Sequence, residues 1–287
     1  MLSIIKYISC FFVILYSVVK EIFKKIVPSK PKNISGKVVL ITGAGGGIGR
    51  QLALKFAAQK TKLALLDIDK ATCDETASQV SALNAPCHSY VCDVSKKENV
   101  ARVAQMVRRD LGEVDILVNN AGVINYKNFR NQTEEDIKRI VNVNLMAMFW
   151  TIQEFLPEMY RRNDGHIVNV SSVAGCIGIG NMEDYTATKY AVRGLSEALA
   201  HEFSHKMTNL HVSIVYPTGV DTPLVHRCIP DKDMLFMFMS PEKAAQIILD
   251  GVLTNKLHIF VPSHLWLVAA LNKLVQQQIQ HAAFVSI

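Results

Sequence analysis

The sequence predicts a single α/β domain built on a doubly wound, mostly parallel sheet. Short apolar runs that end in small or polar residues alternate with segments of helical period along most of the chain. This alternation is typical of parallel strands joined by helices. A glycine-rich turn follows the first run, an acidic residue ends the second, and the 287 residues are 49% hydrophobic. That length and composition are sufficient for one large core.

Charge and cysteine usage exclude several classes of protein. The net charge is +6, but residues 1–37 hold seven lysines and one glutamate, whereas residues 38–287 hold 24 basic and 24 acidic side chains. A neutral domain argues against nucleic-acid binding. The six cysteines form no CxxC pair, and no His, Cys and carboxylate cluster has metal-ligand spacing. We therefore expect free thiols in a reducing compartment and no metal site.

The N-terminal segment predicts a membrane anchor. Residues 2–19 contain 14 apolar side chains, and as a helix they would span about 27 Å, close to a ~30 Å hydrocarbon core. A lysine-rich stretch follows without a small-residue cleavage site, so we expect an uncleaved anchor with the rest of the chain in the cytosol. These lysines also suit anionic lipid head groups. The chain then divides into an anchor with its basic flank (1–27), a linker (28–35), the α/β domain (36–262) and a C-terminal helical extension (263–287).

The glycine-rich turn predicts a phosphate-binding loop. A strand over 37–41 leads into Thr42-Gly43-Ala44-Gly45-Gly46-Gly47-Ile48-Gly49, and a helix is expected over 51–59. Backbone amides and a helix N-terminus in this arrangement bind a pyrophosphate, which a β-carbon would keep at a distance. The alternative is a mobile glycine turn.

The residue that ends the second strand predicts which dinucleotide binds. The strand covers 63–66 and Asp67 follows it. A carboxylate at this point can accept hydrogen bonds from the adenosine ribose, and it would repel a 2′-phosphate. No basic residue lies in the glycine turn before Arg50 or directly after Asp67. NAD is therefore expected and NADP is less favoured; the alternative is an ordinary surface acid.

Polar and small residues follow the remaining strands as well. Further strands are predicted over 88–92, 115–118, 166–170 and 212–216, and further helices over 100–111, 133–160 and 185–203. Ligands of parallel sheets bind at the carboxyl ends of the strands. The residues that follow those ends are Asp93, Asn119 to Gly122, Ser171 to Gly175, and Pro217 to Thr222.

A tyrosine and a lysine predict the catalytic group. Tyr185 and Lys189 are four residues apart at the start of a helix, so both lie on one face. An ammonium beside a phenol lowers the phenol pKa from its usual ~10 and makes it a better general base. Taken alone, the pair is equally an exposed aromatic beside a solvated lysine.

Together these motifs resemble the short-chain dehydrogenase/reductase family over about residues 36–262. Thr42 to Gly49 resembles its TGxxxGxG turn, Asn119 to Gly122 its NNAG segment, and the tetrad is Asn144, Ser172, Tyr185 and Lys189. The resemblance implies a Rossmann-fold domain with a mostly parallel seven-stranded sheet. It implies that the cofactor is bound by Thr42, Gly43, Gly45, Gly47, Ile48, Gly49, Asp67, Asp93, Asn120, Ala121, Gly122, Tyr185, Lys189, Pro217, Thr218, Gly219, Val220 and Thr222.

The resemblance also implies a mechanism and an assembly. Tyr185 would remove the alcohol proton as hydride leaves for NAD, Ser172 would hydrogen-bond the substrate oxygen, and Lys189 would hold the nicotinamide ribose. Asn144 would position a water that connects Lys189 to solvent. Thr218 stands where the family usually has glycine, which leaves the path of that loop open. Homodimers are expected through the two long helices.

The anchor and its lysine-rich flank resemble, more narrowly, the membrane-bound retinol and 17β-hydroxysteroid dehydrogenases of the endoplasmic reticulum and lipid droplets. This implies a lipophilic alcohol substrate at such a membrane. Candidate substrate contacts are Ser172, Tyr185, Cys176, Met182, Met234 and Phe236. Carbonyl reduction by the same site, and a non-catalytic NAD-binding membrane protein, are the alternatives. The apolar stretch 265–279 would lie on the membrane, cover the pocket or pack on the domain.

Overall fold

The computed structural model describes residues 30–228 and 238–267. The chain separates into two compact units, residues 1–33 and residues 34–287, and the second contains the α/β domain. The predicted anchor lies outside the described residues. Among those that are described, no helix is both long enough and apolar enough to cross a membrane.

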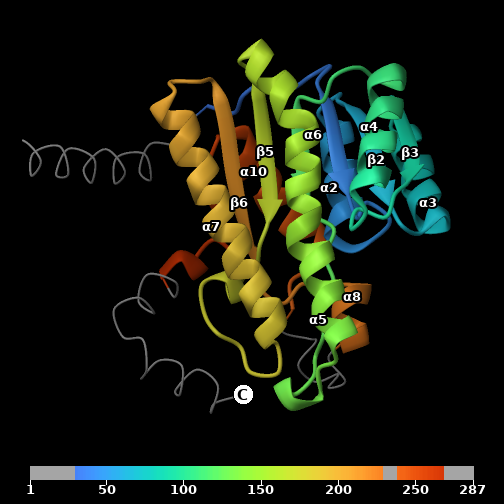
Figure 1. The fold of residues 1–287 in the computed structure, drawn as a ribbon. Coiled ribbons are helices and arrows are strands. Elements are labelled where there is room, and N and C mark those ends of the chain that lie inside the picture. Colours follow the sequence, from blue (N-terminus) through green and yellow to red (C-terminus); the bar gives the residue numbers. More distant parts are fainter. Residues whose placement is uncertain (1–29, 229–237, 268–287) are drawn as a thin grey trace, which may run out of the picture. The chain divides into compact units, whose positions relative to one another are not determined.

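The domain is organised around a seven-stranded sheet in which every pair of neighbouring strands is parallel. The strand order is β3-β2-β1-β4-β5-β6-β7, and Figure 1 shows the strands between two layers of helices. The order reverses between β1 and β4, which is the point where a doubly wound sheet binds its ligand. The strands are β1 (Val38–Thr42), β2 (Lys62–Asp67), β3 (Cys87–Val91), β4 (Ile116–Asn119), β5 (Gly165–Val170), β6 (Leu210–Pro217) and β7 (His258–Val261).

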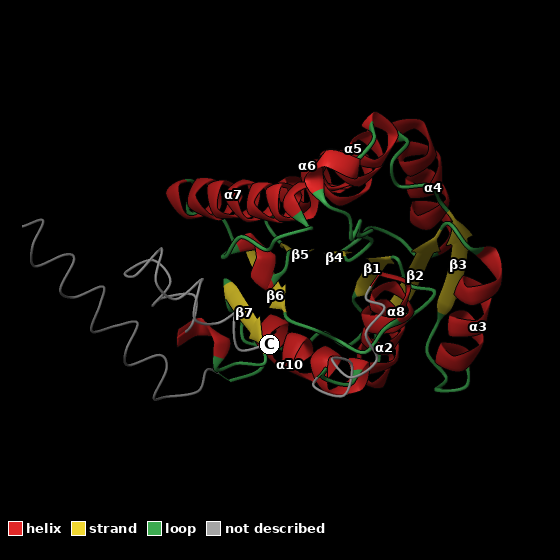
Figure 2. Cartoon of the chain, turned by 90° about the horizontal axis from the view of Figure 1, so that it is seen from below, coloured by secondary structure: helices red, strands yellow, loops and turns green. Residues whose placement is uncertain are grey.

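Helices cover both faces of this sheet. Figure 2 shows α4, α5, α6 and α7 along one face, with α2 and α10 on the other. Alternate residues of β1 serve the two faces: Ile41 packs in the core beneath α2 and α10, and Leu40 in the core beneath α4, α6 and α7. The helices are α2 (Gly47–Ala58), α3 (Lys70–Ser81), α4 (Lys97–Asp110), α5 (Glu134–Val141), α6 (Ala147–Arg162), α7 (Glu183–His205), α8 (Pro223–Cys228) and α10 (Pro241–Leu253).

The predicted α/β class is confirmed, and the differences are local. The helix expected over 133–160 is interrupted by a π-helical segment, Asn142–Met146, within which the side chain of Asn144 bonds to the loop at Val123. The sequence pattern predicts no helix at α3, because the buried residues of this helix are few and partly polar. It does not predict β7 either, because this strand is four residues long and is followed by a proline.

Candidate active site

The glycine turn between β1 and α2 can admit a phosphate group only because it lacks side chains. Gly43 and Gly47 have φ angles of +64° and +54°, which favour glycine. A β-carbon on Gly49 would lie 2.1 Å from the carbonyl oxygen of Gly43. Helix α2 begins inside the turn, at Gly47, and Ile48 packs against the core. Free amides at a helix N-terminus, with no β-carbons in the way, fit a dinucleotide pyrophosphate.

Hydrogen bonds of Asn120 connect this turn to the end of β4. Its Nδ2 donates to the carbonyl oxygens of Thr42 and Gly43, each at 3.0 Å. In return, the Thr42 hydroxyl oxygen accepts from the backbone amides of Asn120 and Ala121, each at 3.0 Å. The two predicted motifs therefore meet at the switch point of the sheet.

Asp67 lies against the same turn. Its Oδ2 accepts from the amide of Gly45 at 2.7 Å, and its Oδ1 accepts from the amide of Asp69 at 3.0 Å. The neighbouring cation, Arg50, also reaches this turn, where it donates to the Gly45 carbonyl at 2.7 Å, and its guanidinium donates to both carboxylate oxygens of Glu75 at 2.8 and 2.7 Å. A carboxylate, and no uncommitted guanidinium, therefore faces this side of the turn.

Asp93 lies at the end of β3, where it stabilises a turn. Its Oδ1 accepts from the amide of Ser95 at 3.0 Å and from the Ser95 hydroxyl at 2.6 Å.

Lys189 is buried beside Tyr185. Only 3% of Lys189 is exposed, and its ammonium donates to the carbonyl oxygen of Val170 at 2.9 Å. The Nζ atom lies 5.4 Å from the centroid of the Tyr185 ring. Burial lowers the pKa of Lys189 to about 8, because a low-dielectric surrounding disfavours the charged form. A β-carbon on Gly122 would lie 3.7 Å from Lys189 Nζ and 3.5 Å from Asn144 Oδ1, so these two side chains meet over the same glycine.

Asn144 connects the π-helical segment to helix α7. Its Oδ1 accepts from the amide of Val123 at 2.8 Å, and its Nδ2 donates to the Val123 carbonyl at 2.9 Å. The same Nδ2 reaches the Thr188 hydroxyl at 3.3 Å, and that hydroxyl donates to the Tyr185 carbonyl at 2.7 Å. A π-bulge at a functional position is a common device for aiming one side chain. Two members of the predicted tetrad, Asn144 and Tyr185, are thereby joined through Thr188.

Ser172 follows β5 at the same edge of the sheet. It is 8% exposed. Its hydroxyl oxygen accepts from the amide of Ala174 at 3.1 Å, and the hydroxyl donates to the Pro217 carbonyl at 3.4 Å. The long second bond is one that a substrate oxygen can replace.

The loop after β6 returns to the glycine turn. Thr218 continues the pairing with β7 through a 3.0 Å bond from its amide to the Val261 carbonyl. The small residue that this loop needs is Gly219, where a β-carbon would lie 2.3 Å from the Phe238 ring, and Val220 is buried in the core. Threonine at position 218, where the family usually has glycine, is therefore compatible with the path of this loop. Thr222 lies beside the turn, its methyl 3.0 Å from the position of a β-carbon on Gly47.

The structure describes only some of the candidate substrate contacts. Cys176 is buried in a cluster with Ile214 and Tyr216, and Arg193 donates to its sulfur at 3.6 Å. Met182 is the residue before α7. Met234 and Phe236 lie outside the described residues.

Cys73, Cys87, Cys92 and Cys176 form no disulfide, and burial raises the pKa of Cys73 and Cys87 to about 12. No cluster of three or more potential metal ligands occurs within residues 30–228 and 238–267.

Sequence reasoning missed two polar networks near the site. In one, Asn119 and Asn169 are hydrogen-bonded at 2.9 Å between β4 and β5, with Thr151 and Ser196 at the two ends. The other includes Arg139, Asn125 and Asp184. In the sequence, the residues of these networks could have been recognised as polar side chains at positions where the strand or helix pattern calls for apolar ones.

The fold and site place this protein among the nicotinamide-dependent oxidoreductases, because a dinucleotide cradle adjoins a tyrosine held beside a buried lysine. Residues 37–233 match the short chain dehydrogenase family. The chain belongs to this family, and within it to the branch of the retinol and hydroxysteroid dehydrogenases.

Curated relatives and solved structures agree with this assignment. The chain is 35% identical to mouse (Mus musculus) epidermal retinol dehydrogenase 2, over 91% of this chain and 85% of the relative. It is 38% identical to mouse 17-beta-hydroxysteroid dehydrogenase 13, with the same two shares covered. Among solved structures, a short chain dehydrogenase/reductase from Burkholderia phymatum in complex with NAD superposes with a TM-score of 0.79 at 26% identity, covering 86% of this chain and 97% of that one.

Proposed function

We propose that this protein oxidises a lipophilic alcohol to its carbonyl compound with NAD, using Tyr185 as the general base. The observation that carries the proposal is the placement of Lys189 Nζ 5.4 Å from the Tyr185 ring centroid, within a site whose glycine turn fits a dinucleotide. The retinol and hydroxysteroid dehydrogenases among the relatives support a retinoid, steroid or long-chain alcohol as the substrate.

The side chains of the site divide the work of proton removal. Tyr185 accepts the hydroxyl proton, and the Ser172 hydroxyl donates a hydrogen bond to the substrate oxygen. Lys189, while protonated, stabilises the phenolate of Tyr185 by its charge. Asn144 positions a water that exchanges protons between Lys189 and solvent. When bound in the glycine turn, NAD supplies the hydride acceptor.

The arrangement around Asp67 supports NAD over NADP. A 2′-phosphate on the adenosine ribose would approach the Asp67 carboxylate, and the guanidinium of Arg50 is held by Glu75 and so does not compensate that repulsion. The Asp67 carboxylate, which accepts one backbone bond on each oxygen, has further lone pairs that can accept hydrogen bonds from the ribose hydroxyls.

The test is turnover of Tyr185→Phe with NAD and with NADP on retinol, estradiol and a fatty alcohol. The substitution removes the proton acceptor, so kcat should fall about 100- to 10,000-fold. Tyr190→Phe is the matched control, because Tyr190 lies on the same helix and is 42% exposed. Its kcat should stay within about two-fold. A Tyr185→Phe enzyme within a few-fold of the parent would refute the base assignment, and a parent without turnover in either direction would refute the function.

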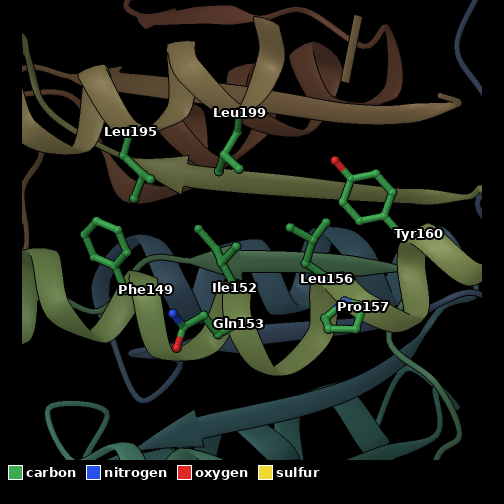
Figure 3. Close-up of a pocket in the computed structure, with 8 residues that line it drawn as sticks. All are labelled: Phe149, Ile152, Gln153, Leu156, Pro157, Tyr160, Leu195 and Leu199. Atoms are coloured by element: carbon green, nitrogen blue, oxygen red, sulfur yellow. The ribbon is translucent and has the colours of Figure 1, made fainter. Parts of the chain in front are cut away.

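We further propose a homodimer formed through α6 and α7. An apolar groove of about 560 Å³ lies on these two helices, and Figure 3 shows side chains from both helices pointing into it. Burying such a face against its copy releases apolar surface from water. The groove is lined by Phe149, Ile152, Gln153, Leu156, Pro157, Tyr160, Leu195 and Leu199.

Light scattering after size exclusion tests the dimer. Leu195→Glu places a charge in the groove and should give a monomer, whereas Leu83→Glu, at a half-exposed position beyond α3, should leave the parent mass. A monomeric parent would contradict the proposal.

The membrane association of residues 1–27 is a proposal that rests on their sequence. The lipophilic substrate class supports an enzyme held at the endoplasmic reticulum or at lipid droplets with its α/β domain in the cytosol. Removing residues 1–27 should move the protein from the membrane fraction to the soluble fraction, and an unchanged distribution would contradict this role.

A further inference from the structure

Side chains hold the backbone of Tyr185 through both its amide and its carbonyl group. Its amide donates to the Asp184 carboxylate at 2.7 Å, and its carbonyl accepts from the Thr188 hydroxyl at 2.7 Å. The residue before α7, Met182, contributes no side-chain cap. Asp184 therefore serves the first turn of α7, where a negative charge also suits the helix dipole.

Asp184 is the end of a hydrogen-bond chain whose direction is fixed. Arg139 of α5 donates to Asn125 Oδ1, and Asn125 Nδ2 donates to Asp184 Oδ2 at 2.8 Å. A guanidinium can only donate, so Asn125 must present its oxygen to Arg139 and its NH2 to residue 184. Residue 184 must then accept from both Asn125 and the Tyr185 amide, which requires two acceptor oxygens. Asn125 is 5% exposed and Asp184 is 8% exposed, so an unmatched donor here is costly.

The same stretch of chain holds the helix that carries Asn144. Within the loop that follows β4, Val123 bonds to the Asn144 side chain, and Asn125 bonds to Asp184. The amide of Lys127 donates to the Asn181 carbonyl at 3.0 Å. Alternate residues of one loop thus connect the π-helical segment with the start of α7, and a shift of either helix is passed to the other.

We propose that Arg139, Asn125 and Asp184 form a positioning relay that sets the place of the Tyr185 phenol relative to Ser172 and Lys189. None of the three touches the reacting atoms. The proposal rests on the proposed function, since it concerns how the general base is aimed. A displacement of about 1 Å at a catalytic group is sufficient to lower the rate about 100-fold.

The fixed donor-to-acceptor order of these hydrogen bonds supplies the test. Exchanging donor and acceptor groups at one of the two residues, 125 or 184, should lower activity, whereas exchanging them at both should restore most of it. Asp184→Asn places an NH2 against the NH2 of Asn125. Asn125→Asp places a carboxylate against the carboxylate of Asp184. In the double variant N125D/D184N, the new carboxylate at position 125 accepts from Arg139 and from the new side-chain NH2 at position 184. The new side-chain carbonyl at position 184 still accepts from the Tyr185 amide.

We expect kcat to fall about 10- to 100-fold in each single variant, with the Kd for NAD changed less than about two-fold. The double variant should recover to within about five-fold of the parent. Recovery is incomplete because Asn125 Nδ2 also donates to the Asp136 carbonyl at 3.2 Å, and an aspartate cannot. Glu183→Gln is the control: Glu183 is the exposed neighbour of Asp184, it bonds to the Asn181 amide, and glutamine can accept the same bond.

Amide hydrogen exchange of segments 122–127 and 183–188 provides a readout that needs no turnover. Exchange should accelerate about ten-fold in both segments of each single variant and return toward the parent rate in the double variant. Single variants with kcat within about two-fold of the parent would overturn the relay, as would a double variant no better than the worse single in both readouts. If the parent enzyme shows no turnover at all, the proposed function fails, and the exchange pattern alone decides whether the relay exists.

Discussion

The cofactor half and the catalytic half of this site are built by opposite means. The glycine turn of residues 42–49 works through missing side chains, since a β-carbon on Gly49 would lie 2.1 Å from a backbone oxygen. The catalytic half works through side chains that bond to one another across separate elements, as Asn144, Thr188 and Tyr185 do. The glycine turn is continuous in sequence, whereas the catalytic half is assembled from residues that lie far apart along the chain.

The two halves therefore differ in the kind of substitution that damages them. In the turn, adding a carbon to Gly43, Gly45 or Gly49 is harmful, because a β-carbon there would lie within 2.9, 2.4 or 2.1 Å of another atom. Around Tyr185 and Lys189, removing or inverting a polar group is harmful, because a buried donor or acceptor is then left without a partner. Three substitutions would break or sharpen this comparison.

The largest effect should come from adding one carbon to the turn. Gly49→Ala forces the backbone near Gly43 apart, so we expect a loss of about 3 kcal/mol or more in unfolding free energy and no NAD binding. Gly46→Ala is the control, because a β-carbon there meets nothing within 4 Å and the backbone is extended, with φ −167°. It should cost no more than about 1 kcal/mol. Urea unfolding without cofactor measures both, and equal losses would contradict the steric argument.

A second effect concerns charge in the catalytic half. Burial lowers the pKa of Lys189 to about 8, below its ordinary value of 10.5. Between these pH values the unfolded chain keeps a proton that the folded protein has lost, so folding stability gains with rising pH. Relative to Lys189→Met, the parent should gain about 3 kcal/mol between roughly pH 7 and pH 11.

Urea unfolding of the parent and of Lys189→Met across this range measures the gain, and groups common to both proteins cancel in the difference. If the difference in unfolding free energy between the two proteins did not change with pH, burial would not lower the pKa of Lys189. Lys206→Met is the control, since Lys206 is an exposed lysine at the end of α7 that pairs with Glu202.

The smallest effect should come from the acid beside the turn. Asp67→Ala removes the repulsion of a 2′-phosphate and the acceptor of the Gly45 amide, so the preference for NAD over NADP in kcat/KM should fall about ten-fold. Asp74→Ala, on α3 with Lys70 and Ser89 as its partners, should leave the preference unchanged. A parent that already prefers NADP would refute the role of Asp67.

Much of the candidate site could be predicted because the ends of parallel strands converge. Once 37–41, 115–118 and 166–170 were assigned as strands, the residues that follow them had to meet at one edge, and Thr42, Asn120 and Ser172 do lie there. The π-helical interruption at Asn144 was not predictable, because no local sequence pattern specifies it or the loop amide of Val123 that Asn144 meets. Whether Met234 and Phe236 contact the substrate stays a prediction.

By itself, the sequence determined the α/β class, the glycine turn and the spacing of Tyr185 and Lys189. These depend on backbone conformations and periodicities that neighbouring residues set on their own. Only the tertiary structure decided that Asn125 and Arg139 face Asp184, that Arg50 is held by Glu75, and that Lys189 is buried deeply enough for its pKa to fall to about 8. Hydrogen-bond partners and desolvation are properties of side chains brought together from distant elements, and they exist only once the sheet has formed.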